Sequence, residues 1–88
     1  MIEDVKTALR ITVDAFDGEI TDLIDAALSD LAHGGVIIDP VSPLVKRAVV
    51  VYCKAYFGYD NPDADRLADA YIAIKKRLMV YGGEHHAT

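Results

Sequence analysis

The sequence predicts an all-α domain, a compact bundle of about four helices with a short apolar connector between the second and third helices. Apolar residues recur every three or four positions over most of the chain, the spacing of one face of an α-helix. Clusters of Gly, Pro, Ser, Asp and Asn separate these stretches, as expected at helix ends. Because 88 residues allow one small domain, we assign residues 1–83 to it and residues 84–88 to a polar C-terminal tail.

The first two helices are predicted from about Ile2 to Arg10 and from Asp17 to about His33. The first has acids early and bases late, as the helix dipole favours. Phe16, in the turn between them, is expected to tuck into the core. Gly34-Gly35 is expected to end the second helix, because glycine accepts a left-handed conformation. The second helix has the clearest apolar stripe, formed by Ile20, Leu23, Ile24, Ala27, Leu28 and Leu31.

An apolar connector follows, Val36 to Pro40. Its three branched apolar residues suit a short strand, but the sequence offers no second strand to pair with it. We therefore expect this segment either to lie against the helices or to pair with another chain.

The third helix is predicted to begin with Ser42 as cap and Pro43 in the first turn, and to run to about Phe57, with Gly58 closing it. It is apolar over most of its circumference, including Tyr56 in the apolar stripe, so it is expected to be buried on more than one side. A partner subunit is one way to cover it. Its strongly polar residues are Lys46, Arg47 and Lys54.

The fourth helix is predicted to start at a turn in which Asn61 or Asp60 caps and Pro62 lies early. Gly82-Gly83 is expected to end it. Its apolar stripe consists of Leu67, Tyr71, Ile74, Leu78 and Tyr81.

Charge is distributed unevenly along the chain. Residues 1–44 carry nine acids and two bases, a net charge of −7, and residues 45–88 carry five acids and seven bases, a net charge of +2. The acidic part of one copy can therefore pack against the basic part of another. Helix caps and solvated helix faces explain the same distribution without any partner. The total of −5 argues against a dedicated nucleic-acid-binding module.

No catalytic or metal-binding constellation is predicted. Cys53 lies on an apolar stripe, as expected of a core thiol. His85-His86 lacks a defined third metal ligand, and His33 is expected to contact the last carbonyls of its helix. We therefore expect no enzymatic activity, no cofactor, no metal and no small-molecule substrate.

Nothing in the sequence predicts secretion or membrane insertion. The acidic start, Met1 to Asp4, differs from the basic start of a signal peptide. The longest apolar stretch, Ala48 to Cys53, is too short to span a bilayer. A single cysteine fits a reducing compartment.

Several segments together resemble the small head–tail connector proteins of long-tailed bacteriophages, also called DNA-packaging or head-completion adaptors. The resemblance covers about residues 2–80. It rests on patterns of helix, cap and apolar residues. These segments are Val5–Ile11, Ile20–Ala27, Pro43 with Val45–Val49, Tyr52–Gly58, Asp60–Asp63 and a helix that ends Lys76-Arg77-Leu78.

The resemblance implies an all-α protomer that assembles into a homo-oligomeric ring of about a dozen copies beneath the portal protein. Such a ring extends the DNA channel, retains packaged DNA and docks tail-side completion or stopper proteins. DNA passes through the lumen without sequence-specific binding. The implied location is the head–tail junction of the virion, after assembly in the host bacterial cytoplasm. No step of this role needs catalysis.

Excess apolar surface suggests an oligomer or partner interface. The candidate residues are Ile37, Ile38, Val50, Val51, Phe57 and Tyr59. The same residues are equally consistent with the core of a tightly packed monomer.

Two classes other than a connector are open. One is a small helical protein-binding regulator or adaptor that acts as a dimer through the third helix. The other is a helix-turn-helix DNA binder, which needs an exposed basic recognition helix. The third helix is too apolar to lie exposed in a DNA groove.

Overall fold

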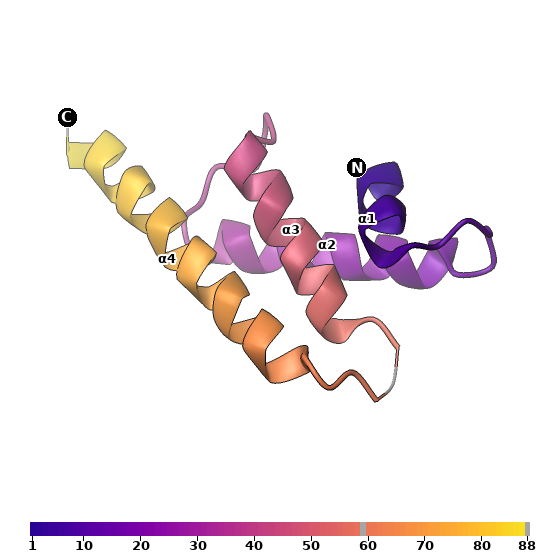
Figure 1. Cartoon of the computed structure of the whole chain (residues 1–88). Helices are drawn as coiled ribbons and strands as arrows, with labels where there is room; N and C mark the ends of the chain where they lie inside the picture. The colour runs from indigo at the N-terminus through magenta and orange to yellow at the C-terminus, as the bar shows by residue number, and fades with distance from the viewer. Residues whose placement is uncertain (59, 88) are drawn as a thin grey trace.

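The chain folds into four helices, α1 (Ile2–Leu9), α2 (Asp17–His33), α3 (Pro43–Tyr56) and α4 (Ala64–Ala87) (Figure 1). The structure is a computed structural model that describes the backbone of residues 1–58 and 60–87 and the side chains of residues 1–58 and 60–80. These residues contain no strand. The prediction of an all-α bundle of four helices, with a short apolar connector between α2 and α3, is therefore confirmed.

Helix α3 is the centre of the bundle, because it contacts each of the other three helices. In Figure 1 it crosses in front of α2, with α1 and α4 on either side. The apolar circumference predicted for α3 is thus buried largely within the protomer. The core combines residues from all four helices, among them Val5, Ile20, Ala27, Leu31, Val45, Ala48, Val49, Cys53, Tyr71 and Leu78.

Helix α2 ends at the predicted glycines. Gly35 has a φ of 87°, in the left-handed region. Its amide donates to the carbonyl of Ala32 (3.0 Å), and the amide of Val36 donates to the carbonyl of Leu31 (3.0 Å). This is the Schellman pattern, and burial of both Val36 and Leu31 adds the apolar contact that often accompanies it.

Helix α1 ends in the same way but without a glycine. Arg10 has a φ of 60°, its amide donates to the carbonyl of Thr7, and the amide of Ile11 donates to the carbonyl of Lys6. Left-handed backbone costs a residue with a Cβ roughly 1–2 kcal/mol, and glycine avoids that cost. Arg10 is therefore a suboptimal residue at this position.

We expect Arg10→Gly to raise the free energy of unfolding by about 0.5–1 kcal/mol, after allowing for the extra freedom of glycine in the unfolded chain. Urea denaturation measures the change. Gly35→Ala is the matched opposite, because an added Cβ there meets no atom within 4 Å and only the positive φ opposes it. A loss of stability in Arg10→Gly would contradict the account of this helix end.

The predicted start of α3 is confirmed. Ser42 Oγ accepts a hydrogen bond from the amide of Val45 (3.2 Å), and Pro43 is the first helical residue. Before α4, Asn61 Oδ1 accepts from the amide of Asp63 (3.0 Å). Ser42 thus satisfies a backbone donor that the first turn of α3 leaves open, whereas Asn61 fixes the turn just before α4.

The end predicted for α4 is wrong. The helix continues through Gly82-Gly83 and ends at Ala87. Glycine keeps its backbone N–H and costs a helix interior only about 1 kcal/mol relative to alanine, so it does not force an end as proline does. The division into a domain (1–83) and a tail (84–88) stays a prediction. Within the described part of the chain, no helix has the length and apolar character that a membrane span requires.

Candidate assembly surfaces

The structure places the predicted interface residues in separate parts of the molecule. Ile37 and Ile38 lie in the connector between α2 and α3, where Ile37 is 60% exposed and Ile38 is half-buried. Val50 and Val51 lie on α3, with Val50 half-buried and Val51 buried. The four residues therefore come from two different elements and differ widely in exposure.

Phe57, half-buried, follows α3 at the opposite end of that helix from the connector. Tyr59 is outside the described residues. Phe57 packs edge-to-face against Phe16, with ring centroids 5.6 Å apart. A hollow of about 490 Å³ at this place is lined by Phe16, Glu19, Tyr56, Phe57 and Gly58.

Two sequence expectations fail at this hollow. Phe16 was expected in the core but is 43% exposed, and Tyr56 was expected in the buried stripe of α3 but is 53% exposed. Both residues lie at helix ends, Phe16 before α2 and Tyr56 at the end of α3. Helical spacing identifies a face but not how far along the helix neighbouring elements cover it. The two aromatic side chains extend the apolar surface beyond the predicted residues.

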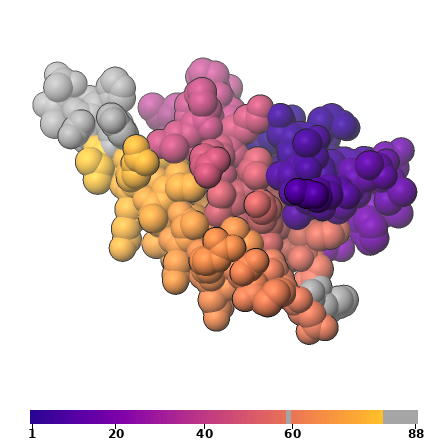
Figure 2. Space-filling model, in the orientation of Figure 1, coloured from indigo at the N-terminus to yellow at the C-terminus, as the bar shows by residue number. Residues whose placement is uncertain are grey.

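A shallow basic groove runs along the outward side of α3. It has a volume of about 370 Å³, and in Figure 2 the surface of α3 lies between those of α1 and α4. Pro43, Arg47, Val50 and Lys54 recur every three or four positions, so they share one face of α3. We define the basic groove by Pro43, Lys46, Arg47, Val50, Val51 and Lys54.

One of the three cations in the basic groove has a partner within the protomer. Lys46 Nζ lies 2.8 Å from Asp4 Oδ1, which links the rim of the basic groove to α1. The hydrogen bond from Lys46 lowers the pKa of the Asp4 carboxyl. Arg47 and Lys54 make no ion pair with any residue that the structure describes. Their charges are therefore available to a partner.

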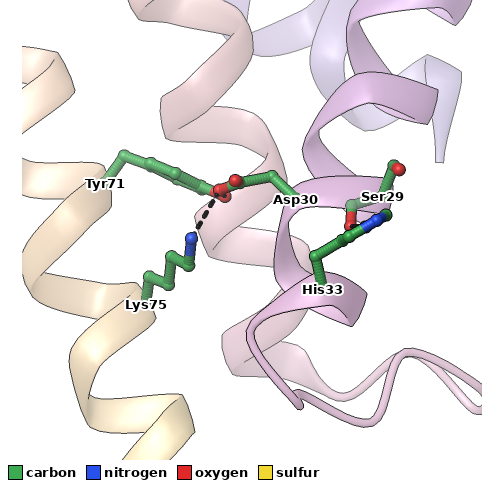
Figure 3. A network of polar contacts seen from close by, with 5 residues as sticks. All are labelled: Ser29, Asp30, His33, Tyr71 and Lys75. Atoms are coloured by element: carbon green, nitrogen blue, oxygen red, sulfur yellow. Dashed lines mark hydrogen bonds and ion pairs between the residues drawn. The ribbon is translucent and has the colours of Figure 1, made fainter.

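Polar contacts fix α4 against α2 (Figure 3). Asp30 Oδ2 accepts hydrogen bonds from the hydroxyl of Tyr71 (2.5 Å) and from Nζ of Lys75 (3.0 Å). These hydrogen bonds, with the largest contribution from Tyr71, lower the pKa of Asp30. Burial, followed by the contact with Asp30, raises the pKa of Tyr71. Beside them His33 Nδ1 donates to the carbonyl of Ser29 (2.9 Å), one turn back in α2.

The sequence gives no local signal for this network. Asp30 lies on the polar side of the predicted α2 stripe, and Tyr71 is 41 positions away. Only the packing of both α2 and α4 against α3 brings the two residues together. The contact between Asp30 and Tyr71 therefore depends on the tertiary fold and could not be predicted from local sequence patterns.

We expect Asp30→Asn to lower the free energy of unfolding at neutral pH and to change it less in acid. Because the folded-state pKa of Asp30 is below its ordinary value of 3.8, the stabilisation is complete above that value and is lost as pH falls through the folded-state pKa. Denaturant titrations at neutral pH and well below pH 3.8 measure the difference. Asp69→Asn, at an exposed position of α4, is the control. Equal effects of Asp30→Asn at both pH values would contradict the network.

A buried charge joins α1 to the start of α2. The Lys6 ammonium, almost fully buried, lies 2.9 Å from Oδ1 of both Asp14 and Asp17. Hydrogen bonds to the two carboxylates, with the largest contribution from Asp17, raise the pKa of Lys6 and keep it charged. This contact holds α1 to the loop before α2 and to the first residue of that helix. Helix α1 also reaches α3, where Asp4 meets Lys46 at the basic groove.

The cysteine and the histidines considered for chemistry lie in places that do not suggest catalysis or metal binding. Cys53 is fully buried, and burial raises the pKa of its thiol to about 11, which disfavours the reactive thiolate at neutral pH. Among the described residues, no group of three or more His, Cys, Asp or Glu side chains is placed to hold a metal ion. The side chains of His85 and His86 lie outside the described part of the chain.

Comparison with known proteins identifies the family. No curated protein and no solved structure matches the chain. A family model described as "Phage connector protein" matches residues 1–85, a span that includes α1, α2, α3 and most of α4. The resemblance to head–tail connectors is thereby confirmed. The chain belongs to the phage connector protein family, a family of structural proteins of the bacteriophage virion at its head–tail junction.

Proposed function

We propose that this chain forms a ring of about a dozen copies beneath the portal protein, extends the DNA channel, retains packaged DNA and docks tail-side completion proteins. The observation that carries the proposal is the family match over residues 1–85. The role is structural, and none of its steps requires bond making or breaking by the protein.

The exposed apolar side chains support assembly. Ile37 and Tyr56 are each more than half exposed, and Phe16 is 43% exposed. They lie at opposite ends of α3, in the connector that precedes it and in the hollow at its end. Large apolar groups are also exposed at Val13 and, on α4, at Ile72, Met79 and Val80. So much exposed apolar surface on a small domain is typical of a protein that buries part of its surface on association. Two different surfaces also suit a head-to-tail contact, which can close into a ring.

The net charge of −5 supports passage of DNA. A protein binds the duplex by neutralising phosphates with Lys and Arg, and each neutralised phosphate adds a salt-dependent term to the affinity. An acidic lumen neutralises few phosphates, so the duplex slides through it. Tight, salt-sensitive binding of duplex DNA to the isolated protein would contradict this part of the proposal.

Phage particles made without this protein test the role directly. We expect capsids to assemble and package DNA but to lose the DNA on purification and to carry no tails, as seen by electron microscopy and nuclease protection. Supplying the wild-type chain from a plasmid should restore infectious particles. Tailed, DNA-filled and infectious particles in the absence of the protein would overturn the proposal.

A further inference from the structure

We infer that the basic groove on α3 binds the outward face of α2 in a second copy of this chain. This inference rests on the proposed ring and names the two surfaces that would join neighbouring protomers. The outward face of α2, which we call the acidic face, is exposed over its length. It consists of Gly18, Asp22, Asp25, Ala26 and Ser29.

The basic groove has the chemistry of a protein-binding surface. Lys46, Arg47 and Lys54 surround an apolar floor that Pro43, Val50 and Val51 provide. In a chain of net charge −5, these cations form a local positive surface on the central helix. Since Arg47 and Lys54 make no ion pair with the described residues, an acidic partner would supply the missing charges.

The acidic face has the complementary charge and a shape that fits a groove. Ile20, Ile24 and Leu31 form the buried stripe of α2, and Asp22 and Asp25 lie on the other side of the helix. Neither aspartate forms an ion pair with any described residue. Their exposed neighbours on this face have small side chains, so another helix can approach closely.

The positions of the two surfaces favour a head-to-tail contact between copies. Helix α3 lies in front of α2 in Figure 1, so the outward side of α3 and the outward side of α2 are opposite sides of the protomer. One protomer therefore cannot satisfy its own basic groove with its own acidic face. Repeating the contact from copy to copy produces a heterologous chain of subunits, which closes into a ring where the rotation permits.

A DNA phosphate backbone is the other ligand with matching charge. The basic groove has an apolar floor and only three cations, one of them already paired with Asp4, and the protein as a whole repels phosphate. These features favour the acidic face of a second copy. Binding of duplex DNA to the groove is one of the outcomes that the charge-reversal variants below distinguish.

Paired charge reversals test the inference. Variant one carries Arg47→Glu and Lys54→Glu in the basic groove, and variant two carries Asp22→Lys and Asp25→Lys on the acidic face. Because like charges then face each other, we expect each variant alone to assemble at least about tenfold more weakly than wild type by sedimentation velocity, alone and with portal protein. The controls are Lys76→Glu/Arg77→Glu and Asp65→Lys/Asp69→Lys, which make the same changes in net charge at exposed positions of α4.

Mixing the two variants gives the sharper result. The acidic groove of variant one matches the basic face of variant two, and the unchanged groove of variant two matches the unchanged face of variant one. An equimolar mixture should therefore recover assembly, with the two variants alternating, although neither variant assembles alone. Each control, whose groove and acidic face are unchanged, should assemble as wild type does. Circular dichroism checks that all variants are folded.

The outcomes separate this inference from the proposed function. If the groove variant assembles as strongly as wild type, or if the mixture of the two variants does not assemble, the inference is overturned and the ring proposal stays intact. Loss of duplex DNA binding in the groove variant, with assembly unaffected, would also overturn it and assign the groove to phosphate. A wild-type chain that stays monomeric at every concentration, alone and with portal protein, would overturn both.

Discussion

Leu31→Ala is expected to lower the free energy of unfolding by about 2–5 kcal/mol. Leu31 is fully buried in α2, and its carbonyl and side chain take part in the helix end formed with Val36. Truncation removes apolar burial and leaves a cavity that the surrounding helices fill only in part. For a domain of this size the loss is a large fraction of the total stability, which is of the order of 0.1 kcal/mol per residue.

Urea denaturation followed by circular dichroism measures this change. Ile72→Ala is the matched control, because Ile72 is 47% exposed on α4 and its truncation should change stability by no more than about 0.5 kcal/mol. Similar effects of the two substitutions would show that α2 does not bury its apolar stripe as described.

Ala48→Leu is expected to destabilise the fold by about 1–3 kcal/mol. Ala48 is fully buried on α3, the helix that contacts all three others. A larger side chain there must push a neighbouring helix away or adopt a strained rotamer. The same substitution at Ala73, which is exposed on α4, should leave stability within about 0.5 kcal/mol of wild type. An Ala48→Leu protein as stable as wild type would contradict the close packing around α3.

Local signals explain why most helix bounds were predictable. Ser42 with Pro43 marks a helix start, and Gly34-Gly35 marks an end, through hydrogen bonds made within a few residues. The end predicted at Gly82-Gly83 failed because glycine permits both a cap and a continued helix. Where the local chemistry allows two structures, sequence alone does not choose between them.

The assembly surfaces were predictable only in part. Helical spacing places Lys46, Val50 and Lys54 on one side of α3, but it does not show which sides the other helices cover. The candidate set therefore combined Ile37, which is exposed, with Val51, which the bundle buries. The pairing of Asp30 with Tyr71 needs the tertiary fold, because the two residues come from α2 and α4.

The mass in solution shows whether this phage connector protein forms a ring. Light scattering after size exclusion gives the mass of the purified chain over a concentration series, alone and with the portal protein. We expect a discrete species of about a dozen protomers, formed by the chain itself or on the portal. A monomer or dimer at every concentration, with and without the portal, would contradict ring formation, and a stable dimer would favour a dimeric helical regulator.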